Sequence, residues 1–395
     1  MKLRAWADEH VRLSSERAAE IARSGLVEVR LVAPPDQWRL VTDSRVGVVV
    51  GRDWELRVEP RLEIPKLLFL LAFARSQDGW RDVMAGFGRD EQLLDVVASG
   101  FARHADTAVE RGLMRGYVHV EERRQDIRGR VRFADQIARL PGLPLPVEVA
   151  YDEHTADVRE NRLLKTAGEI LLRLPRIPLR ARSRLLRLRS LLDEVSILRD
   201  PRDFVRPPIT RLNVRYEPAL VLAELILRRT SITAESGEVS SASFVFDMNR
   251  VFEDFVSAAL ADALRRHGGE VRLQHVDRLE ETGTALPIKP DITWWSGPQC
   301  LAVVDAKYKS IANRSMPNAD AYQMLAYCIA LSRRRGYLVY AQDSGEVPRA
   351  HTIRNSGHVV DVRVLDVALE PEQLLTRVDA LASSIVRDAV AAKAA

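Results

Sequence analysis

Two aspartates and a lysine lie in one short stretch whose pattern would bring them together. Residues 289–309 read KPDITWWSGPQCLAVVDAKYK, in which two runs of β-branched and aromatic residues flank the turn-forming Ser296–Gln299. This pattern predicts a strand, a turn and a second strand. Folded about that turn, Asp291 lies roughly opposite Asp305, and directly paired positions are about 5 Å apart. Because side chains alternate along a strand, Asp305 and Lys307 project from the same face.

Two carboxylates and an ammonium group are suited to hydrolysis of a phosphodiester with a divalent cation. Mg²⁺ takes few, hard oxygen ligands and keeps several waters, and Mn²⁺ can replace it. Asp291 and Asp305 would be ligands, with the Ala306 carbonyl as a third oxygen. The cation would lower the pKa of a water and clamp a phosphoryl oxygen, while Lys307 would orient that water. The alternative is a surface hairpin in which Asp305 and Lys307 form no more than an ion pair.

A helix is predicted on each side of this hairpin, and each carries further candidate residues. Upstream, apolar residues of Phe246–Arg266 recur at helical spacing, with Glu253 and Asp254 in the early turns. Glu253 would complete the acidic shell, either on the metal or through a bridging water, and Asp254 is its weaker competitor. In the alternative interpretation both carboxylates only stabilise the N-terminal end of the helix through its dipole.

Downstream, the stretch from residue 320 to residue 335 is predicted to form a second helix, followed by a strand. Gln323 and Tyr327 are i and i+4 and share one face of this helix. Gln323 would orient Lys307 or the scissile phosphate, and Tyr327 would pack beneath Gln323 or contact the DNA backbone. Lys309 could also touch DNA. The alternatives are an ordinary amphipathic helix and a solvated lysine.

The order of these elements resembles the PD-(D/E)xK nuclease superfamily, including its RecB-like branch. The elements are the acidic helix, the PD…DAK hairpin, the helix with Q-x-x-x-Y and the strand. The phrases FDMNRVFEDFV, KPDI and VVDAKYK are more specifically similar to the McrC family, the nuclease subunits of McrBC modification-dependent restriction systems. The resemblance continues in VGVVVGRDWELRVEPRLEI, RGRVRF, ENRLLK and RLNVRYEPALVLAELIL. It therefore covers most of the chain, and the catalytic positions show no departure from it.

The resemblance implies a Mg²⁺-dependent DNA endonuclease subunit of an anti-phage restriction system. It implies docking on a hexameric ring of an McrB-like AAA+ GTPase, insertion into the central pore of that ring and stimulation of its hydrolysis. The partner would use GTP, read methylated cytosine in double-stranded DNA and deliver that DNA to the nuclease. This chain would bind no nucleotide itself, and its sequence contains no G-x-x-x-x-G-K-[ST] phosphate loop.

Two other classes of protein have to be weighed against this one. A stand-alone RecB-like DNA repair nuclease would share the acidic hairpin, but the long stretch of residues 1–240 argues against a minimal stand-alone enzyme. A non-catalytic activator or adaptor of an AAA+ ring would share the remainder of the chain. The intact set of Asp291, Asp305 and Lys307 argues against that class.

The composition is that of an ordinary globular protein, since 46% of the 395 residues are hydrophobic and 29% are charged. The net charge of +4 permits nucleic-acid binding without requiring it. Cys300 and Cys328 fall in a predicted strand and helix, which favours buried thiols over a disulfide or a metal pair. No apolar run is long enough for a membrane span and the N-terminus lacks a signal-peptide pattern, so we expect a cytoplasmic protein with no membrane partner.

The order of the elements predicts a multi-domain α/β protein with three parts. Residues 1–66 would form a small N-terminal β-rich domain and residues 67–240 a helical, partner-docking region. Residues 241–395 would form a restriction-endonuclease-like α/β/α domain of the PD-(D/E)xK type. In the middle region we expect helices at residues 67–74, 91–111, 158–174, 180–192 and 217–227, and a hairpin that pairs residues 117–122 with 128–133.

Two groups of arginines in the middle region are candidate contact surfaces. The first lies on the expected hairpin, which could plug a ring-shaped partner or simply be a solvated edge: Arg123, Arg124 and Arg128. The second lies on an arginine-rich helix, which could line a path for DNA phosphates or be a solvated helix face: Arg180, Arg184 and Arg187.

Overall fold

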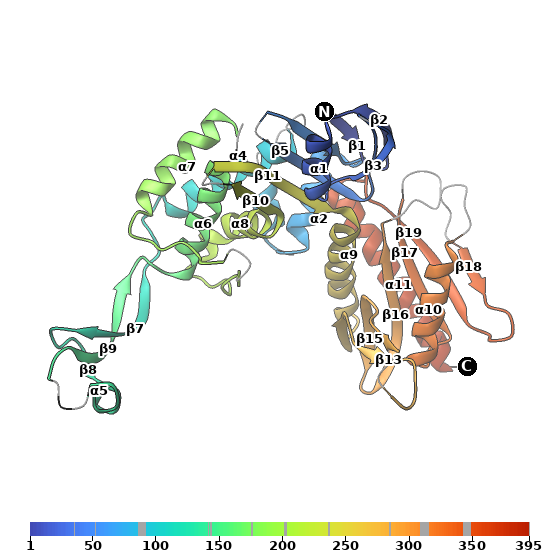
Figure 1. Ribbon diagram of the computed structural model, residues 1–395. Helices are drawn as coiled ribbons and strands as arrows, with labels where there is room; N and C mark the ends of the chain where they lie inside the picture. Colours follow the sequence, from blue (N-terminus) through green and yellow to red (C-terminus); the bar gives the residue numbers. More distant parts are fainter. Residues whose placement is uncertain are drawn as a thin grey trace. The chain divides into compact units, whose positions relative to one another are not determined.

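The computed structural model describes residues 1–34, 36–51, 53–85, 92–140, 142, 144–174, 177–200, 204–235, 238–283, 286–308, 316–342 and 349–394. Tertiary contacts divide the chain into two compact units, which Figure 1 shows. The first combines residues 1–94 with residues 231–395, and the second is residues 95–230. No helix in the described ranges is long and apolar enough to cross a membrane.

The first unit contains a five-stranded sheet built from two distant parts of the chain. In sheet order its strands are β1 Lys2–Arg4, β6 Glu55–Glu59, β5 Arg45–Gly51, β11 Glu238–Asp247 and β10 Thr230–Glu235. Strand β11 pairs antiparallel with β5, with Phe244 opposite Val48. At Gly47 (φ 142°) a Cβ would lie 2.0 Å from the Phe244 carbonyl oxygen, so this pairing requires glycine. The segment that leads into the C-terminal part of the chain is therefore held by the N-terminal sheet.

Smaller elements complete this N-terminal part of the first unit. They are a three-stranded sheet of β2 Asp8–Arg12, β4 Gln37–Val41 and β3 Glu28–Ala33, and the helices α1 Ser15–Arg23, α2 Ile64–Phe73 and α3 Trp80–Met84. Phe69 and Phe73 of α2 each meet Phe255 of helix α9 (Met248–Arg265) with ring centroids 5.6 Å apart. Helices α2 and α3 therefore belong to the same compact unit as residues 241–395. This division differs from the three domains expected from sequence, residues 1–66, 67–240 and 241–395.

A six-stranded mixed sheet forms the C-terminal part of the first unit. In sheet order its strands are β12 Glu270–Leu273, β15 Ile292–Ser296, β16 Gln299–Lys307, β17 Arg335–Gln342, β19 Val359–Asp366 and β18 Arg349–Thr352. A two-stranded hairpin of β13 Asp277–Arg278 and β14 Pro287–Ile288 precedes β15. The remaining helices are α10 Asn318–Ala330 and α11 Pro371–Ala394.

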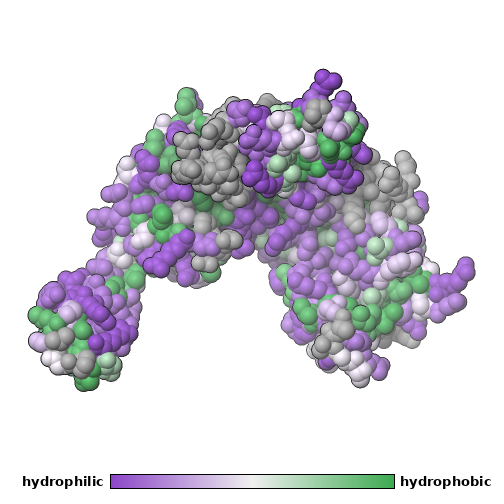
Figure 2. All heavy atoms as spheres, in the orientation of Figure 1, coloured by the Kyte–Doolittle hydropathy of each residue, from purple (hydrophilic) through white to green (hydrophobic). Residues whose placement is uncertain are grey.

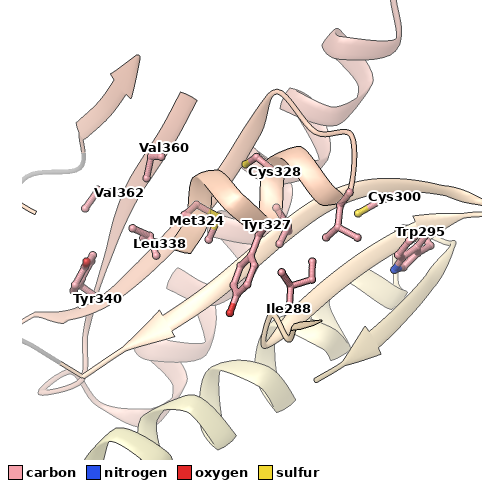
Figure 3. Close-up of a cluster of buried hydrophobic side chains, with 12 residues drawn as sticks. Ile288, Trp295, Cys300, Met324, Tyr327, Cys328, Leu338, Tyr340, Val360 and Val362 are labelled. Atoms are coloured by element: carbon pink, nitrogen blue, oxygen red, sulfur yellow. The ribbon is translucent and has the colours of Figure 1, made fainter. Parts of the chain in front are cut away.

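Helices lie on both faces of this sheet. On one face α10 contributes Met324 and Cys328 to a buried cluster with Val303, Leu338 and Val360, which Figure 3 shows. Full burial of such a side chain contributes about 1.5–3 kcal/mol. On the other face, the Tyr337 hydroxyl donates a hydrogen bond to Asp388 of α11, and α9 packs beside α11. The structure is therefore a mixed α/β fold in which β16 is a central, covered strand.

Among its described residues, the second unit combines four longer helices and one short helix with an extended three-stranded sheet. The longer helices are α4 Leu93–Val109, α6 Arg159–Arg173, α7 Leu179–Leu191 and α8 Glu217–Arg229, with a 3-10 turn at Val214–Tyr216. The longer helices match the expected ranges closely. The sheet has the order β7 Gly116–Arg124, β9 Val147–Thr155 and β8 Arg130–Val131, and the short helix α5 Phe133–Arg139 follows β8.

One expectation for this unit is wrong. Residues 117–122 do not pair with residues 128–133. Strand β7 pairs along its whole length with β9, and β8 pairs with the other edge of β9. The nine-residue strand β9 satisfies far more backbone groups of β7 than the two-residue β8 could. Its sequence, VEVAYDEHT, carries three acidic residues, and it was not expected to be a strand.

Buried polar side chains hold the base of the β7–β9 pair. The amide nitrogen of Asn161 donates to the carbonyl oxygens of Met114 and Ala156 at 2.8 and 2.7 Å. These two residues flank β7 and β9 where the strands leave the helices. The Tyr216 hydroxyl accepts a hydrogen bond from the Met114 amide at 2.8 Å. Because Asn161 and Tyr216 are fully buried, the sheet is fixed to the helical part of its own unit by groups that water cannot replace.

Replacing Tyr216 by phenylalanine should therefore destabilise the protein. The substitution leaves the Met114 amide without its acceptor, and an unsatisfied group of this kind costs about 1–3 kcal/mol. Thermal and chemical unfolding measure the loss. Tyr117→Phe on β7, where the side chain is 78% exposed, is the matched control and should leave stability unchanged. Equal stabilities for the two variants would contradict the role given to the buried hydroxyl.

Candidate acidic site at the β15–β16 hairpin

The hairpin expected around residues 296–299 is confirmed. Strands β15 and β16 are antiparallel, with Ile292 opposite Val304, and Gly297 takes a left-handed φ of 57° in the turn. Asp291 directly precedes β15, and one of its carboxylate oxygens, Oδ2, accepts a hydrogen bond from the Ala306 amide at 2.8 Å. Asp291 and Asp305 are 7% and 2% exposed. The structure thus brings both carboxylates to one end of the hairpin, in a place with little water.

Lys307 lies against the second carboxylate. Its Nζ is 2.6 Å from Asp305 Oδ2, and its side chain is 20% exposed, so it borders both the buried carboxylates and solvent. Burial, followed by the charge of Asp291, raises the pKa of Asp305 to about 7. Burial opposes the charge of Lys307, yet the neighbouring Asp305 raises the pKa of the lysine above its usual value. The lysine is therefore a cation at neutral pH.

Helix α9 adds a third carboxylate. Glu253 Oε1 and Asp291 Oδ1 both accept hydrogen bonds from the side-chain nitrogen of Gln274, at 2.7 and 2.8 Å. Burial, and then the charge of Asp291, raises the pKa of Glu253 to about 7. The neighbouring Asp254 has a carboxylate oxygen 3.9 Å from a guanidinium nitrogen of Arg75. Of the two adjacent acids, Glu253 is the one that shares a hydrogen-bond donor with Asp291.

The residues expected on α10 lie beside this cluster. Tyr327 is buried, its hydroxyl donates a hydrogen bond to the Lys289 carbonyl at 3.3 Å, and Figure 3 shows its ring among the buried apolar side chains. Burial, together with the charges of Asp305 and Asp291, raises the pKa of Tyr327. Gln323 is exposed and forms a hydrogen bond with Tyr327. Lys309 lies outside the described residues.

The arginines expected to contact DNA or a partner belong to the second unit. On α7, Arg187 and Arg184 have guanidinium nitrogens 2.8 and 3.6 Å from the carboxylate of Asp106, while Arg180 is exposed. These residues are not part of the acidic cluster, which belongs to the first unit. Pairing with Asp106 offsets part of the positive charge that a DNA backbone would meet.

The arginines of the β7–β9 sheet are also paired with acids. Arg123 donates to Glu148 at 2.6 Å. Arg128 donates to Glu153 at 3.1 Å and lies over the Tyr151 ring. Arg124 donates to acids on its own strand and in the following turn, Glu122 and Asp126. Since β9 was not expected as a strand, the pairing of Arg123 and Arg128 with its acids was not expected either.

Sequence reasoning missed an apolar surface at the end of this sheet. Ile127, Phe133 and Ile137 are 68%, 70% and 70% exposed, and Figure 2 shows hydrophobic atoms there. Phe133 and Ile137 are one helical turn apart on α5, so both lie on one side of it. Their i, i+4 spacing was readable from sequence, whereas their exposure was not. Large exposed apolar groups that lie together are typical of a binding surface.

The residues of the acidic site fit a divalent cation. No three His, Cys, Asp or Glu side chains in the described ranges already surround one point as a metal site would. Mg²⁺, however, is usually bound by one or two carboxylates and keeps waters. Asp305 Oδ2 is buried without a well-aligned hydrogen-bond donor among the described residues, although Lys307 Nζ is close. Asp291, Asp305, Glu253 and the Ala306 carbonyl are the groups that could hold such an ion.

The fold and this site define a multi-domain α/β protein with an acidic cluster at one end of a hairpin. The model of the McrBC 5-methylcytosine restriction system component family matches residues 40–341, and the chain belongs to that family. A search of curated proteins finds no match.

Two solved structures from Thermococcus gammatolerans are similar to the chain. One is the half-complex from the tetradecameric assembly of McrB AAA+ hexamers with bound McrC, with a TM-score of 0.59 and 18% identity over 98% of this chain and 99% of that one. The other is the McrBC complex, with a TM-score of 0.42 and 20% identity over 67% of this chain and 88% of that one. The first of these shows that the fold extends over nearly the whole chain.

The raised pKa of Asp305 predicts how stability changes with pH in the absence of divalent cations. The pKa in the folded protein, about 7, lies above the ordinary 3.8, so the contribution of this carboxyl to stability is lost as pH rises through about 7. Asp305→Asn removes that loss. The unfolding free energy of this variant relative to the original protein should rise from about pH 4 to about pH 7 and stay level above that.

Denaturant titrations in EDTA across this pH range measure the difference. The control is Asp262→Asn, on the exposed side of α9, where the carboxylate is 46% exposed. It should leave the pH dependence unchanged. A difference between Asp305→Asn and the original protein that stays constant with pH would contradict the assigned pKa.

Proposed function

We propose that the chain is a Mg²⁺-dependent endodeoxyribonuclease, the DNA-cleaving subunit of a McrBC-like anti-phage restriction system. Mn²⁺ would also serve as the cofactor in place of Mg²⁺. The chain itself would bind no nucleotide. The observation that carries the proposal is the convergence of Asp291, Asp305 and Lys307 at one end of a buried hairpin. With α9 on one face of the sheet and α10 on the other, this is the arrangement expected of a PD-(D/E)xK nuclease domain. Family membership supports the same conclusion.

Each side chain has a role that its position supports. A bound Mg²⁺ would supply a water of lowered pKa and a positive charge beside the scissile phosphate. Asp291 and Asp305 would hold the cation, the Ala306 carbonyl would add an oxygen, and Glu253 would complete the acidic shell. Lys307, positively charged and partly exposed, orients the attacking water and stabilises negative charge on the phosphate. Gln323 and Tyr327 support this face from α10.

The partner in this proposal is an McrB-like AAA+ GTPase hexamer that delivers double-stranded DNA containing methylated cytosine. The similar solved assembly contains McrB AAA+ hexamers with bound McrC. A stand-alone RecB-like repair nuclease would not need the second unit, residues 95–230. A non-catalytic adaptor would not need buried carboxylates of raised pKa beside a lysine. The repair-nuclease alternative therefore does not explain the second unit, and the adaptor alternative does not explain the buried carboxylates.

Within the second unit, the end of the β7–β9 sheet is the surface proposed to dock on this partner. The arginines expected to dock, Arg123, Arg124 and Arg128, are paired with acids. Phe133 and Ile137 expose apolar surface instead. Removal of such surface from water drives most protein association. Apolar contact, with the arginines at its border, is therefore the proposed basis of docking.

Asp305→Ala and Lys307→Ala should each lower the DNA cleavage rate at least about a hundredfold while leaving docking and GTPase stimulation intact. The assay uses methylated and unmethylated plasmid, Mg²⁺ and the purified chain, with and without the partner and GTP. Asp262→Ala and Lys2→Ala, at exposed ion pairs away from the hairpin, are the matched controls and should cleave normally. Normal cleavage by purified Asp305→Ala protein would refute the nuclease assignment.

The double variant Phe133→Asp/Ile137→Asp should lower stimulation of the partner's GTP hydrolysis about tenfold or more, because charged groups replace apolar anchors. Both positions are exposed, so folding is retained. Leu212→Asp, at a position 79% exposed elsewhere in the unit, is the control. GTPase measurements with increasing amounts of each variant make the comparison, and stimulation equal to that of the control would show that the partner docks elsewhere.

A further inference from the structure

Gln274 is joined to the acidic site by its side chain and its backbone. Its side-chain nitrogen donates to Glu253 Oε1 at 2.7 Å and to Asp291 Oδ1 at 2.8 Å. Its backbone amide donates to the Asp291 carbonyl oxygen at 2.9 Å. One amide group therefore connects helix α9, the end of β12 and the start of β15. No motif in the sequence singled out this residue.

The backbone of Gln274 is itself unusual. Its φ is +50°, in the left-handed region that a long, non-glycine side chain seldom adopts. Such conformations persist when the surrounding structure imposes them, and they are found more often at functional sites. Here the left-handed turn ends β12 and directs the amide between two carboxylates. The hydrogen bonds to Glu253 and Asp291 offset the conformational energy of this unfavourable backbone.

The amide nitrogen lies between two like charges, the carboxylates of Glu253 and Asp291. The other oxygen of Asp291, Oδ2, already accepts the Ala306 amide. Oδ1 is therefore the Asp291 oxygen that pairs with Glu253 across the amide. Two N–H groups of one neutral amide satisfy both carboxylates and reduce their repulsion without adding charge. The amide nitrogen lies 2.7 and 2.8 Å from the two carboxylate oxygens, so a cation attracted to the same oxygens would compete with it for them.

We propose that Gln274 is a positioning residue whose amide bridges Glu253 and Asp291 and competes with a divalent cation for their oxygens. The inference rests on the proposed function. The amide holds Glu253 and Asp291 together before metal arrives, so the site does not have to assemble against charge repulsion. The same hydrogen bonds oppose metal binding, since they are broken when the ion enters. Loss of the amide should therefore lower the stability of the protein in EDTA and increase its affinity for Mg²⁺.

The test compares Gln274→Met with Gln274→Gly. Methionine keeps the length of glutamine and the same backbone preference but lacks both donors. Glycine adopts the left-handed backbone freely and also lacks the donors. Titration calorimetry with Mg²⁺ alone, without DNA, should show about tenfold tighter binding in both variants. The rise in melting temperature from EDTA to saturating Mg²⁺ should also be larger than in the original protein.

The control is Gln373→Met, an exposed position on α11, which should change neither quantity. Weaker or unchanged Mg²⁺ binding in both Gln274 variants would overturn the inference and leave the proposed nuclease function standing. Absence of Mg²⁺ binding in the original protein would overturn both. An effect in only one variant would assign the change to the backbone rather than to the amide.

Discussion

Repulsion among buried carboxylates is the constraint on which this structure depends. Asp291 and Asp305 are buried and Glu253 is half-buried beside them, so burial, and then the charge of Asp291, raises the pKa values of Asp305 and Glu253 to about 7. A fold keeps such an arrangement only if other groups oppose the repulsion. Lys307 does so with a charge, and the Ala306 amide and Gln274 do so with hydrogen bonds.

Several layers of the fold hold these groups in place. The hairpin sets the two aspartates, while α9 brings Glu253 and is itself fixed by strand β11 in the N-terminal sheet. Gly336 lies so close to α10 that a Cβ there would be 2.3 Å from the Met324 sulfur, so α10 can approach the sheet. The acidic site therefore depends on residues far along the chain. The second unit, by contrast, holds its sheet with its own buried groups, Asn161 and Tyr216.

Local pattern was enough to predict the longer helices and the hairpin that brings Asp291 and Asp305 together, but not which strands pair across the sheets. The hairpin of Asp291 and Asp305 followed from alternation and turn residues, and the buried thiols Cys300 and Cys328 were also expected correctly. The pairing of β11 with β5 joins segments about two hundred residues apart, which periodicity cannot reveal. The acidic strand β9 resembled a polar loop. The position of Gln274 depends on a left-handed backbone, which no sequence pattern signalled.

Anomalous scattering from crystals grown with Mn²⁺ would directly test the proposal that these side chains gather around a divalent cation. We expect a strong peak beside Asp291 and Asp305, within reach of Glu253, with the Gln274 amide turned out of the space between the carboxylates. Crystals saturated with Mn²⁺ that show no peak at this hairpin, and the amide still bonded to both acids, would contradict it.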